Sequence, residues 1–187
     1  MTTNVIICHG AYGHPGENWY PWLGKELEKS GCRVFIPEFP TPEGQSLASW
    51  LKVLRGLDSY IGPQTIMVGH SISCAFILKK IESLKKPIKA AFLISGFLGD
   101  VGDERFDRIN RSFFEKGFDW KKIRKNCAHF EVWHADNDPY LPVARGKEIA
   151  DNLGIEVTII KGAGHFNEKT GYTMFPLLLK EIKAQLY

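Results

Sequence analysis

The sequence has no long hydrophobic run, and its first residues do not predict a secretory leader. The stretch from Met1 to Asn4 carries no basic side chain and passes directly into a short apolar segment. A secretory signal needs a positively charged start before its apolar region, and a membrane helix needs about 20 apolar residues in succession. We therefore expect a soluble cytoplasmic protein that makes no membrane contact.

Cysteine is scarce and scattered. The four cysteines, Cys8, Cys32, Cys74 and Cys127, each lie in or beside an apolar run, and no Cys-x-x-Cys occurs. This pattern is typical of small buried hydrophobic residues rather than of a disulfide framework or a metal site. We expect the protein to use no metal and no cofactor.

The sequence also lacks a strong charge imbalance. Its 24 Lys and Arg against 21 Asp and Glu give a net charge of +3, too little to favour nucleic acid as a partner. The lysine pairs at 79–80, 85–86 and 121–122 are interpreted as solvated helix ends rather than a phosphate-binding patch. The glycine-rich loop from His9 to Gly16 has neither G-x-G-x-x-G nor Walker spacing, which weighs against a nucleotide-binding α/β domain.

What the sequence does contain is a regular alternation of strand and helix patterns. Its 187 residues, 44% of them hydrophobic, fit one domain spanning 1–187. This alternation predicts an α/β fold of three layers, with about six parallel strands and helices on both faces. Strands are expected at 5–8, 32–36, 65–68, 88–95, 127–134 and 155–160; helices at 19–29, 46–60, 105–116, 120–125, 143–152 and 169–186, with a further helix that follows Ser71 and ends before Pro87. Periodicity loosens over 96–126, an excursion expected to flank the ligand site.

The stretch Val68-Gly69-His70-Ser71-Ile72-Ser73-Cys74 resembles a nucleophile elbow. An apolar run, a tight turn bearing a serine and a helix follow one another, and such a turn presents the hydroxyl at the carboxyl edge of the sheet. The pattern departs from G-x-S-x-G because Ser73 occupies the final glycine position. The plainer alternative is a strand-to-helix turn with a serine N-cap.

Two neighbours of this serine are expected to have supporting roles only. The side chain of His70 should point away from the Ser71 hydroxyl and pack beneath the loops. Cys74 lies one helical turn further on in an apolar setting, which is typical of an inert buried thiol.

An elbow serine needs a base, and the base needs an acid. His165 follows the sixth predicted strand in a glycine-rich turn, so its imidazole should reach the same sheet edge. Either Asp136 or Asp138, after the fifth strand, could orient it; we favour Asp138 because Pro139 fixes its backbone, and Asp136 should cap the turn. Asp100 and Asp103 are weaker rivals. The order Ser71, Asp138, His165 is the serine–acid–histidine order of α/β-hydrolases.

A tetrahedral intermediate also needs two hydrogen-bond donors for its oxyanion. The N–H of Ile72, directly after the nucleophile, should be one. The N–H of Ala11 should be the other, with Gly10 supplying the unusual backbone that turns it inward.

The substrate pocket is expected to be aromatic. The segment from Gly96 to Trp120 would supply five phenylalanines beside its mouth, Phe97, Phe106, Phe113, Phe114 and Phe118. Tyr12, Trp19 and Tyr140 would line the same space. Phe106, Ile109 and Phe113 fall on one helical face, although that face could simply cover the sheet. Such walls favour an apolar acyl or alcohol group over a charged one.

Several segments spread over nearly the whole chain resemble the small serine hydrolases typified by retinoblastoma-binding protein nine, a compact branch of the α/β-hydrolases. They are His9-Gly10, Trp19-Tyr20-Pro21-Trp22-Leu23, Pro37-Glu38-Phe39-Pro40, Gly69-His70-Ser71, Phe118-x-Trp120-x-x-Ile123-x-x-Asn126, Asp136-Asn137-Asp138-Pro139-Tyr140-Leu141-Pro142 and Gly162-Ala163-Gly164-His165-Phe166. The resemblance implies a triad of Ser71, Asp138 and His165, and it supports Asp138 over Asp136. It further implies a short fold of six parallel strands, without an extra antiparallel pair and without a large lid.

These features together predict a serine hydrolase that cleaves small carboxylic esters, or amides and short peptides, through an acyl-enzyme. The expected partner is the small-molecule substrate, and no protein partner can be named. The alternative is a hydrolase-fold interaction protein with little or no turnover.

Overall fold

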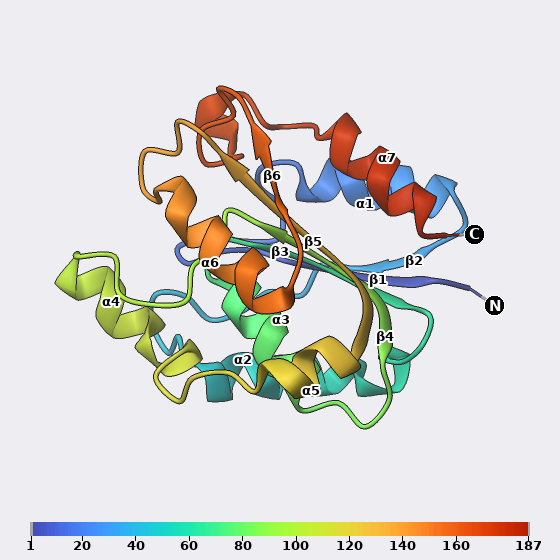
Figure 1. The fold of residues 1–187 in the computed structure, drawn as a ribbon. Coiled ribbons are helices and arrows are strands. Elements are labelled where there is room, and N and C mark those ends of the chain that lie inside the picture. Colours follow the sequence, from blue (N-terminus) through green and yellow to red (C-terminus); the bar gives the residue numbers. More distant parts are fainter. Residues whose placement is uncertain (1, 187) are drawn as a thin grey trace.

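The computed structural model describes residues 2–186, which form one sheet of six parallel strands between two layers of helices (Figure 1). The strand order across the sheet is β2-β1-β3-β4-β5-β6. The strands are β1 (Asn4–Cys8), β2 (Arg33–Phe35), β3 (Thr65–His70), β4 (Ile88–Ile94), β5 (Cys127–Ala135) and β6 (Val157–Ile160). The helices are α1 (Tyr20–Lys29), α2 (Leu47–Leu54), α3 (Ser73–Glu82), α4 (Glu104–Asn110), α5 (Trp120–Lys125), α6 (Val143–Leu153) and α7 (Pro176–Ala184). The predicted fold class is confirmed.

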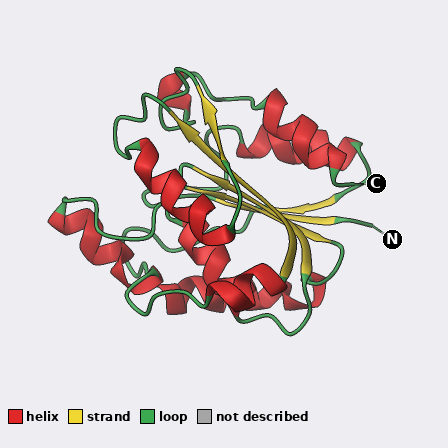
Figure 2. Ribbon diagram, viewed as in Figure 1, coloured by secondary structure: helices red, strands yellow, loops and turns green. Residues whose placement is uncertain are grey.

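The sheet lies between two layers of helices (Figure 2), and a hydrophobic core fills the space on each side of it. Successive side chains of a strand point to opposite faces, and β1 follows this rule: Ile6 packs with α2 and α3, whereas Val5 and Ile7 pack with α1 and α7. Helices α5 and α6 join the Ile6 side. Because both faces are covered, the central strands read as continuous apolar runs.

The side of the sheet to which successive strands are added changes between β1 and β3. From β1 the chain moves outward to the edge strand β2, then crosses back to β3 and continues through β4, β5 and β6. The helix after β1 lies on one face and the helix after β3 on the other, so their loops part at the carboxyl ends of these strands (Figure 1). Ligands of open α/β sheets bind at such a position. The pairing of Cys8 with Gly69 sets the loop after β1 beside the one that carries Ser71.

Local sequence explains where most helices begin and end. Ser46 caps α2 in a reciprocal capping box with Ser49. Pro142 immediately precedes α6, and Gly154 closes it with φ +76°, a left-handed conformation that glycine adopts without strain.

Three predicted helices are wrong in their extents. The segment predicted at 46–60 is α-helical only to Leu54 and continues as a 3₁₀ helix over Arg55–Tyr60. The one predicted at 105–116 is α4 followed by a 3₁₀ turn, Arg111–Phe113. Helix α3, in contrast, follows Ser71 and ends at Glu82, before Pro87, as predicted. The last helix does not begin at 169. The left-handed backbone of Gly171 interrupts the predicted helix, and α7 begins at Pro176.

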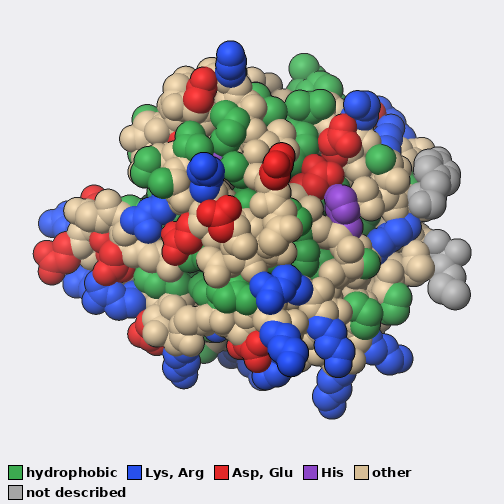
Figure 3. Space-filling model, viewed as in Figure 1, with side chains coloured by type: hydrophobic (Ala, Val, Ile, Leu, Met, Phe, Trp, Pro, Cys, Tyr) green, Lys and Arg blue, Asp and Glu red, His purple; other side chains and the backbone are tan. Residues whose placement is uncertain are grey.

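The surface carries lysine and arginine side chains along the lower edge in Figure 3. Three of the chain's lysines form ion pairs: Lys79 with Glu82 (2.9 Å), Lys80 with Asp58 (2.8 Å) and Lys122 with Asp119 (3.2 Å). Within residues 2–186, no helix combines the length and apolarity needed to cross a bilayer.

Candidate active site

Ser71 occupies a strained turn between β3 and α3. Its φ is +60°, a left-handed value that a residue with a side chain rarely adopts. The turn is held because the Ser71 N–H donates to the Ile94 carbonyl (2.9 Å) and the Cys74 N–H donates to the Ser71 carbonyl (3.0 Å). A Cβ on Gly69 would lie 3.0 Å from the backbone carbonyl oxygen of Ser73 and 2.8 Å from Cδ1 of Ile77, so the lack of a side chain helps the strand and helix to approach this closely. This is the geometry expected of a nucleophile elbow.

Ser73, the departure from the elbow pattern, is fully buried and has a specific partner. Its hydroxyl donates to the carbonyl of His9, in the loop after β1. A buried hydroxyl with a partner is satisfied, so serine fits where related patterns have glycine. It also ties the start of α3 to the neighbouring loop.

His165 and Asp138 are joined directly. Nδ1 of His165 lies 2.8 Å from Oδ2 of Asp138, whose side chain is fully buried. Since an ionised carboxylate can only accept, Nδ1 carries the proton and Nε2 is left with its lone pair. Burial alone would raise the pKa of Asp138, but the hydrogen bond and charge of His165 and the N–H groups of Tyr140 and Leu141 outweigh it and lower that pKa.

The other candidate acids have different roles. Asp136 accepts from the Gly162 N–H (2.8 Å) and so braces the loop after β6 against the loop after β5. Asp100 forms a surface ion pair with Arg111 (2.8 Å), and Asp103 caps the start of α4. None of these three carboxylates contacts His165.

Asn137, to which the sequence reasoning assigned no separate role, makes a second brace of the same kind. Its side-chain oxygen accepts from the Gly164 N–H (2.8 Å). Its place between the two aspartates was the only sequence signal. Together with Asp136 it sets the turn that carries His165.

His70 supports this turn from below. Its Nε2 donates to the carbonyl of His165 (2.7 Å), so its Nδ1 must accept from the hydroxyl of Tyr20 (2.6 Å). Burial and the nearby His165 lower the pKa of His70 to about 3. The side chain is thus engaged with Tyr20 and the His165 backbone rather than with the Ser71 hydroxyl, as expected.

Cys74 is not a candidate nucleophile. Its thiol is fully buried, and burial raises its pKa. Its Sγ contacts the carbonyls of Gly69 and Ile94 at 3.5 Å. A protonated thiol packed against backbone acts as a small hydrophobic group.

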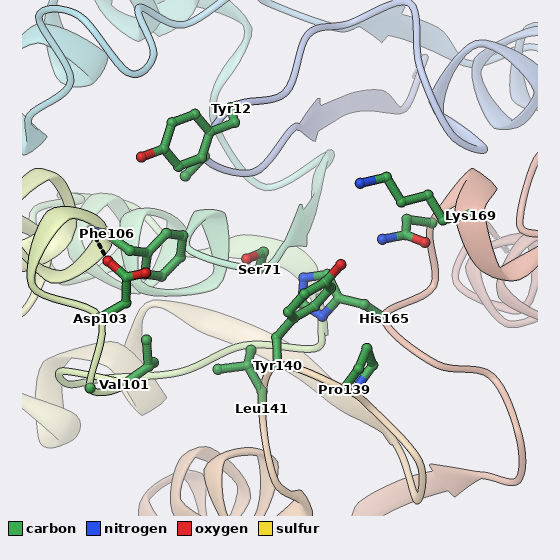
Figure 4. A pocket seen from close by; sticks show the side chains of 13 residues that line it. Tyr12, Ser71, Val101, Asp103, Phe106, Pro139, Tyr140, Leu141, His165 and Lys169 are labelled. Carbon is green, nitrogen blue, oxygen red and sulfur yellow. Dashed lines mark hydrogen bonds between the residues drawn. The ribbon is translucent and has the colours of Figure 1, made fainter.

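A cavity of about 590 Å³ opens above these residues (Figure 4). Ser71 and His165 both line it. In the view of Figure 4, Ser71 lies between Phe106 on one side and His165 on the other, with Tyr12 opposite. A hydroxyl and an imidazole, from the loops after β3 and β6, therefore meet at one cavity, and the Asp138 carboxylate is buried behind the imidazole to which it is hydrogen-bonded.

The two amides expected to hold an oxyanion are placed consistently with that role. Ala11 lines the cavity and Ile72 follows Ser71 at the start of α3. Neither N–H donates a hydrogen bond to another residue in the described part of the chain. The backbone of Gly10 has no positive φ, and a Cβ there would lie 3.1 Å from Cβ of Ser71, so the lack of a side chain lets the two loops approach this closely.

The predicted pocket residues divide into two groups. Tyr12, Tyr140 and Phe106 line the cavity, and the two tyrosines are more than half exposed. Trp19, Phe97 and Phe113 are fully buried in the two cores, and Phe114 and Phe118 pack against one of them. None of these five lines the cavity, so their prediction is wrong.

These buried rings support the site from behind. Trp19 donates its indole N–H to the carbonyl of Phe166 (2.8 Å), beside His165. Phe97 packs behind Phe106, with ring centroids 5.8 Å apart. Which side of a loosely periodic segment faces the core could not be determined from spacing alone.

The cavity walls are more polar than expected. Apolar surface comes from Val101, Phe106 and Leu141, but Asn167 and Lys169 form the rim beyond His165. Sequence reasoning missed these two. Their position two and four residues after His165 was a signal that could have identified them.

Comparison with known proteins assigns nearly the full length of the chain to one protein family. A family model described as "Serine hydrolase" matches residues 5–184. The chain is 29% identical over 180 residues to a protein named "Putative hydrolase YdeN" from Bacillus subtilis, covering 95% of this chain and 93% of that protein. It is 28% identical over 187 residues to "Serine hydrolase RBBP9" from Rattus norvegicus, covering 98% and 96%. The crystal structure of the ydeN gene product from B. subtilis superposes with a TM-score of 0.91 over 98% of both chains, at 27% identity.

Proposed function

Because this chain belongs to the serine hydrolase family, we propose that it cleaves carboxylic esters of modest size through an acyl-enzyme on Ser71. The single observation that carries the proposal is the 2.8 Å hydrogen bond from His165 to Asp138, at a cavity that the left-handed Ser71 also lines. This arrangement supplies the nucleophile, base and acid that acyl transfer requires.

In the first step the Ser71 hydroxyl attacks the carbonyl carbon of the substrate while Nε2 of His165 takes its proton. Asp138 holds Nδ1 and stabilises the imidazolium that results. The negative charge that develops on the carbonyl oxygen is received by the N–H groups of Ile72 and Ala11, which have no other partner in the described part of the chain. The partial positive charge of the helix dipole at the start of α3 stabilises the same oxyanion.

In the second step the C–O bond to the alcohol breaks and His165 returns its proton to the leaving oxygen. His165 then deprotonates a water molecule, which attacks the carbonyl carbon of the acyl-enzyme. The bond between Ser71 and the acyl group breaks, His165 returns the proton to the Ser71 oxygen, and the acid is released. Each step needs only the chain's own groups and water. Amides and short peptides are the second substrate class, with a poorer leaving group.

Val101, Phe106 and Leu141 form the apolar side of the cavity, which supports binding of an apolar acyl or alcohol group there. A cavity of about 590 Å³ holds a ligand of modest size.

The proposal is tested with chromogenic esters of graded acyl length and a matched amide panel. Turnover of esters by the native chain, and its loss in Ser71→Ala, is the expected result. No turnover of any ester or amide would favour the alternative of a hydrolase-fold interaction protein. Undiminished turnover in Ser71→Ala would assign the chemistry to another residue.

A further inference from the structure

Ser95, at the carboxyl end of β4, has an unusual backbone that the proposed reaction does not yet use. Its φ is +47°, left-handed for a residue that carries a side chain, and it is fully buried. Such strain persists only where the surrounding structure imposes it, and it concentrates at functional sites. The next residue, Gly96, shows how tight the turn is, since a Cβ there would lie 2.6 Å from Cβ of Cys74.

The hydroxyl of Ser95 donates to Oδ2 of Asp138 at 3.0 Å. This is the same oxygen that accepts from Nδ1 of His165. The other oxygen, Oδ1, accepts from the N–H groups of Tyr140 and Leu141 (2.9 and 3.1 Å), which belong to the acid's own loop. Within the described residues, Ser95 and His165 are the two side chains that hydrogen-bond this carboxylate; Nε2 of His134, in β5, lies 3.9 Å from Oδ2, beyond hydrogen-bond distance.

The turn that carries Ser95 also contacts the nucleophile. The carbonyl of Ile94 accepts the N–H of Ser71 (2.9 Å), and the N–H of Ser95 donates to the carbonyl of Trp133 in β5 (2.9 Å). Two consecutive residues, Ile94 and Ser95, therefore hold the nucleophile through the backbone and the acid through a side chain. The end of β4 sets the position of one relative to the other.

We propose that Ser95 is a positioning residue: its hydroxyl fixes the Asp138 carboxylate so that Oδ2 faces His165 and the imidazole is aligned toward Ser71. The proposal rests on the proposed function of these three residues. Without the hydroxyl, the carboxylate would be held only by its own loop and by the imidazole that it is meant to orient.

The test compares Ser95→Ala and Ser95→Gly with a control, Ser112→Ala. Both Ser95 variants remove the hydroxyl, but glycine also relieves the left-handed strain and should fold better than the alanine variant. Ser112 accepts the N–H of Leu47 (2.9 Å) remote from the acid, so its variant reports the loss of an ordinary serine hydrogen bond.

Two readouts separate positioning from structure. The first is the ester kinetics: kcat should fall by about tenfold or more in both Ser95 variants, as for loss of a hydrogen bond to a charged group, with KM changed by less than about twofold. The second is the low-field proton NMR signal of the His165 Nδ1–H, identified by its absence in His165→Ala. It should shift or broaden in both Ser95 variants and stay in place in Ser112→Ala.

The outcomes are distinguishable. If kcat and the proton signal are unchanged in both Ser95 variants, the proposal is overturned. It is also overturned if Ser95→Gly behaves as native and only Ser95→Ala is impaired, because backbone strain would then account for the whole effect. If the native chain hydrolyses nothing but the signal still moves in both Ser95 variants, the positioning role stands and the proposed function fails.

Discussion

The hydroxyl of Tyr20 donates to Nδ1 of His70 across 2.6 Å, and His70 in turn holds the backbone carbonyl of His165. The first helix is thereby connected, through one buried imidazole, to the turn that carries the proposed base. This imidazole must stay neutral, because both of its nitrogens already have fixed roles.

The neutral state of His70 makes stability depend on pH. Burial and the neighbouring His165 lower its pKa from 6.5 to about 3 in the folded chain. Below pH 6.5 the unfolded chain binds a proton that the folded chain refuses, so the unfolding free energy should fall as the pH drops toward 3. For one group the limit is about 1.4 kcal/mol per pH unit.

Denaturant unfolding at about pH 7, 5.5 and 4.5 checks this prediction, because these values run from above the ordinary histidine pKa to between it and the lowered pKa of His70. His70→Gln should be less stable at pH 7 but show a flatter pH dependence. His14→Gln, at an exposed histidine, should keep the native slope. Equal slopes for all three chains would contradict the role given to His70.

The two aspartates after β5 should differ sharply. Asp138→Asn removes the charge that orients His165, and we expect kcat to fall on the order of a thousandfold or more. Asp136→Asn keeps an oxygen for the Gly162 N–H and should cost about tenfold at most. Steady-state kinetics on one ester compares them, and a larger loss for Asp136→Asn would reverse the assignment.

Phe106 should contribute to substrate affinity. It lines the cavity and stacks with Tyr12 at a centroid separation of 6.3 Å. Phe106→Ala should raise KM by about tenfold for long or aromatic acyl groups, since a buried phenyl contributes about 1.5–3 kcal/mol. The effect on acetate esters should be smaller. Phe118→Ala is the control, because Phe118 packs against Trp120 and does not line the cavity. Equal effects of the two variants on KM would argue against a pocket role for Phe106.

Gly10 should be required for its lack of a side chain. Gly10→Ala would place a Cβ 3.1 Å from Cβ of Ser71. The nucleophile would have to shift by a few tenths of an ångström, and kcat should fall by about tenfold. Gly56→Ala is the control, because a Cβ there meets nothing within 4 Å. Native kinetics in Gly10→Ala would show that the loop can move without consequence.

Much of this architecture could be predicted from sequence because strong local signals agreed. Apolar strand runs, helix caps and the glycine-flanked turns predicted six parallel strands and the edge at which Ser71, Asp138 and His165 would meet. Pro139 and the loop position were enough to prefer Asp138, and the structure joins that residue to His165.

What could not be predicted depended on contacts between distant segments. The left-handed backbone of Ser95 and its bond to Asp138 leave no mark in a serine that follows an apolar strand. Phe113 and Phe106 share a helical face in the sequence, yet a 3₁₀ turn after α4 sends Phe113 into the core and leaves Phe106 at the cavity. Propensity and spacing do not contain that information.

Covalent capture tests the central claim most directly. The native chain is treated with a fluorophosphonate, and the modified peptide is identified by mass spectrometry, alongside Ser71→Ala, His165→Ala and Cys74→Ala. We predict one phosphonyl adduct on Ser71, lost in Ser71→Ala, strongly slowed in His165→Ala and retained in Cys74→Ala. An unreactive native chain, or an adduct that persists in Ser71→Ala, would contradict the account.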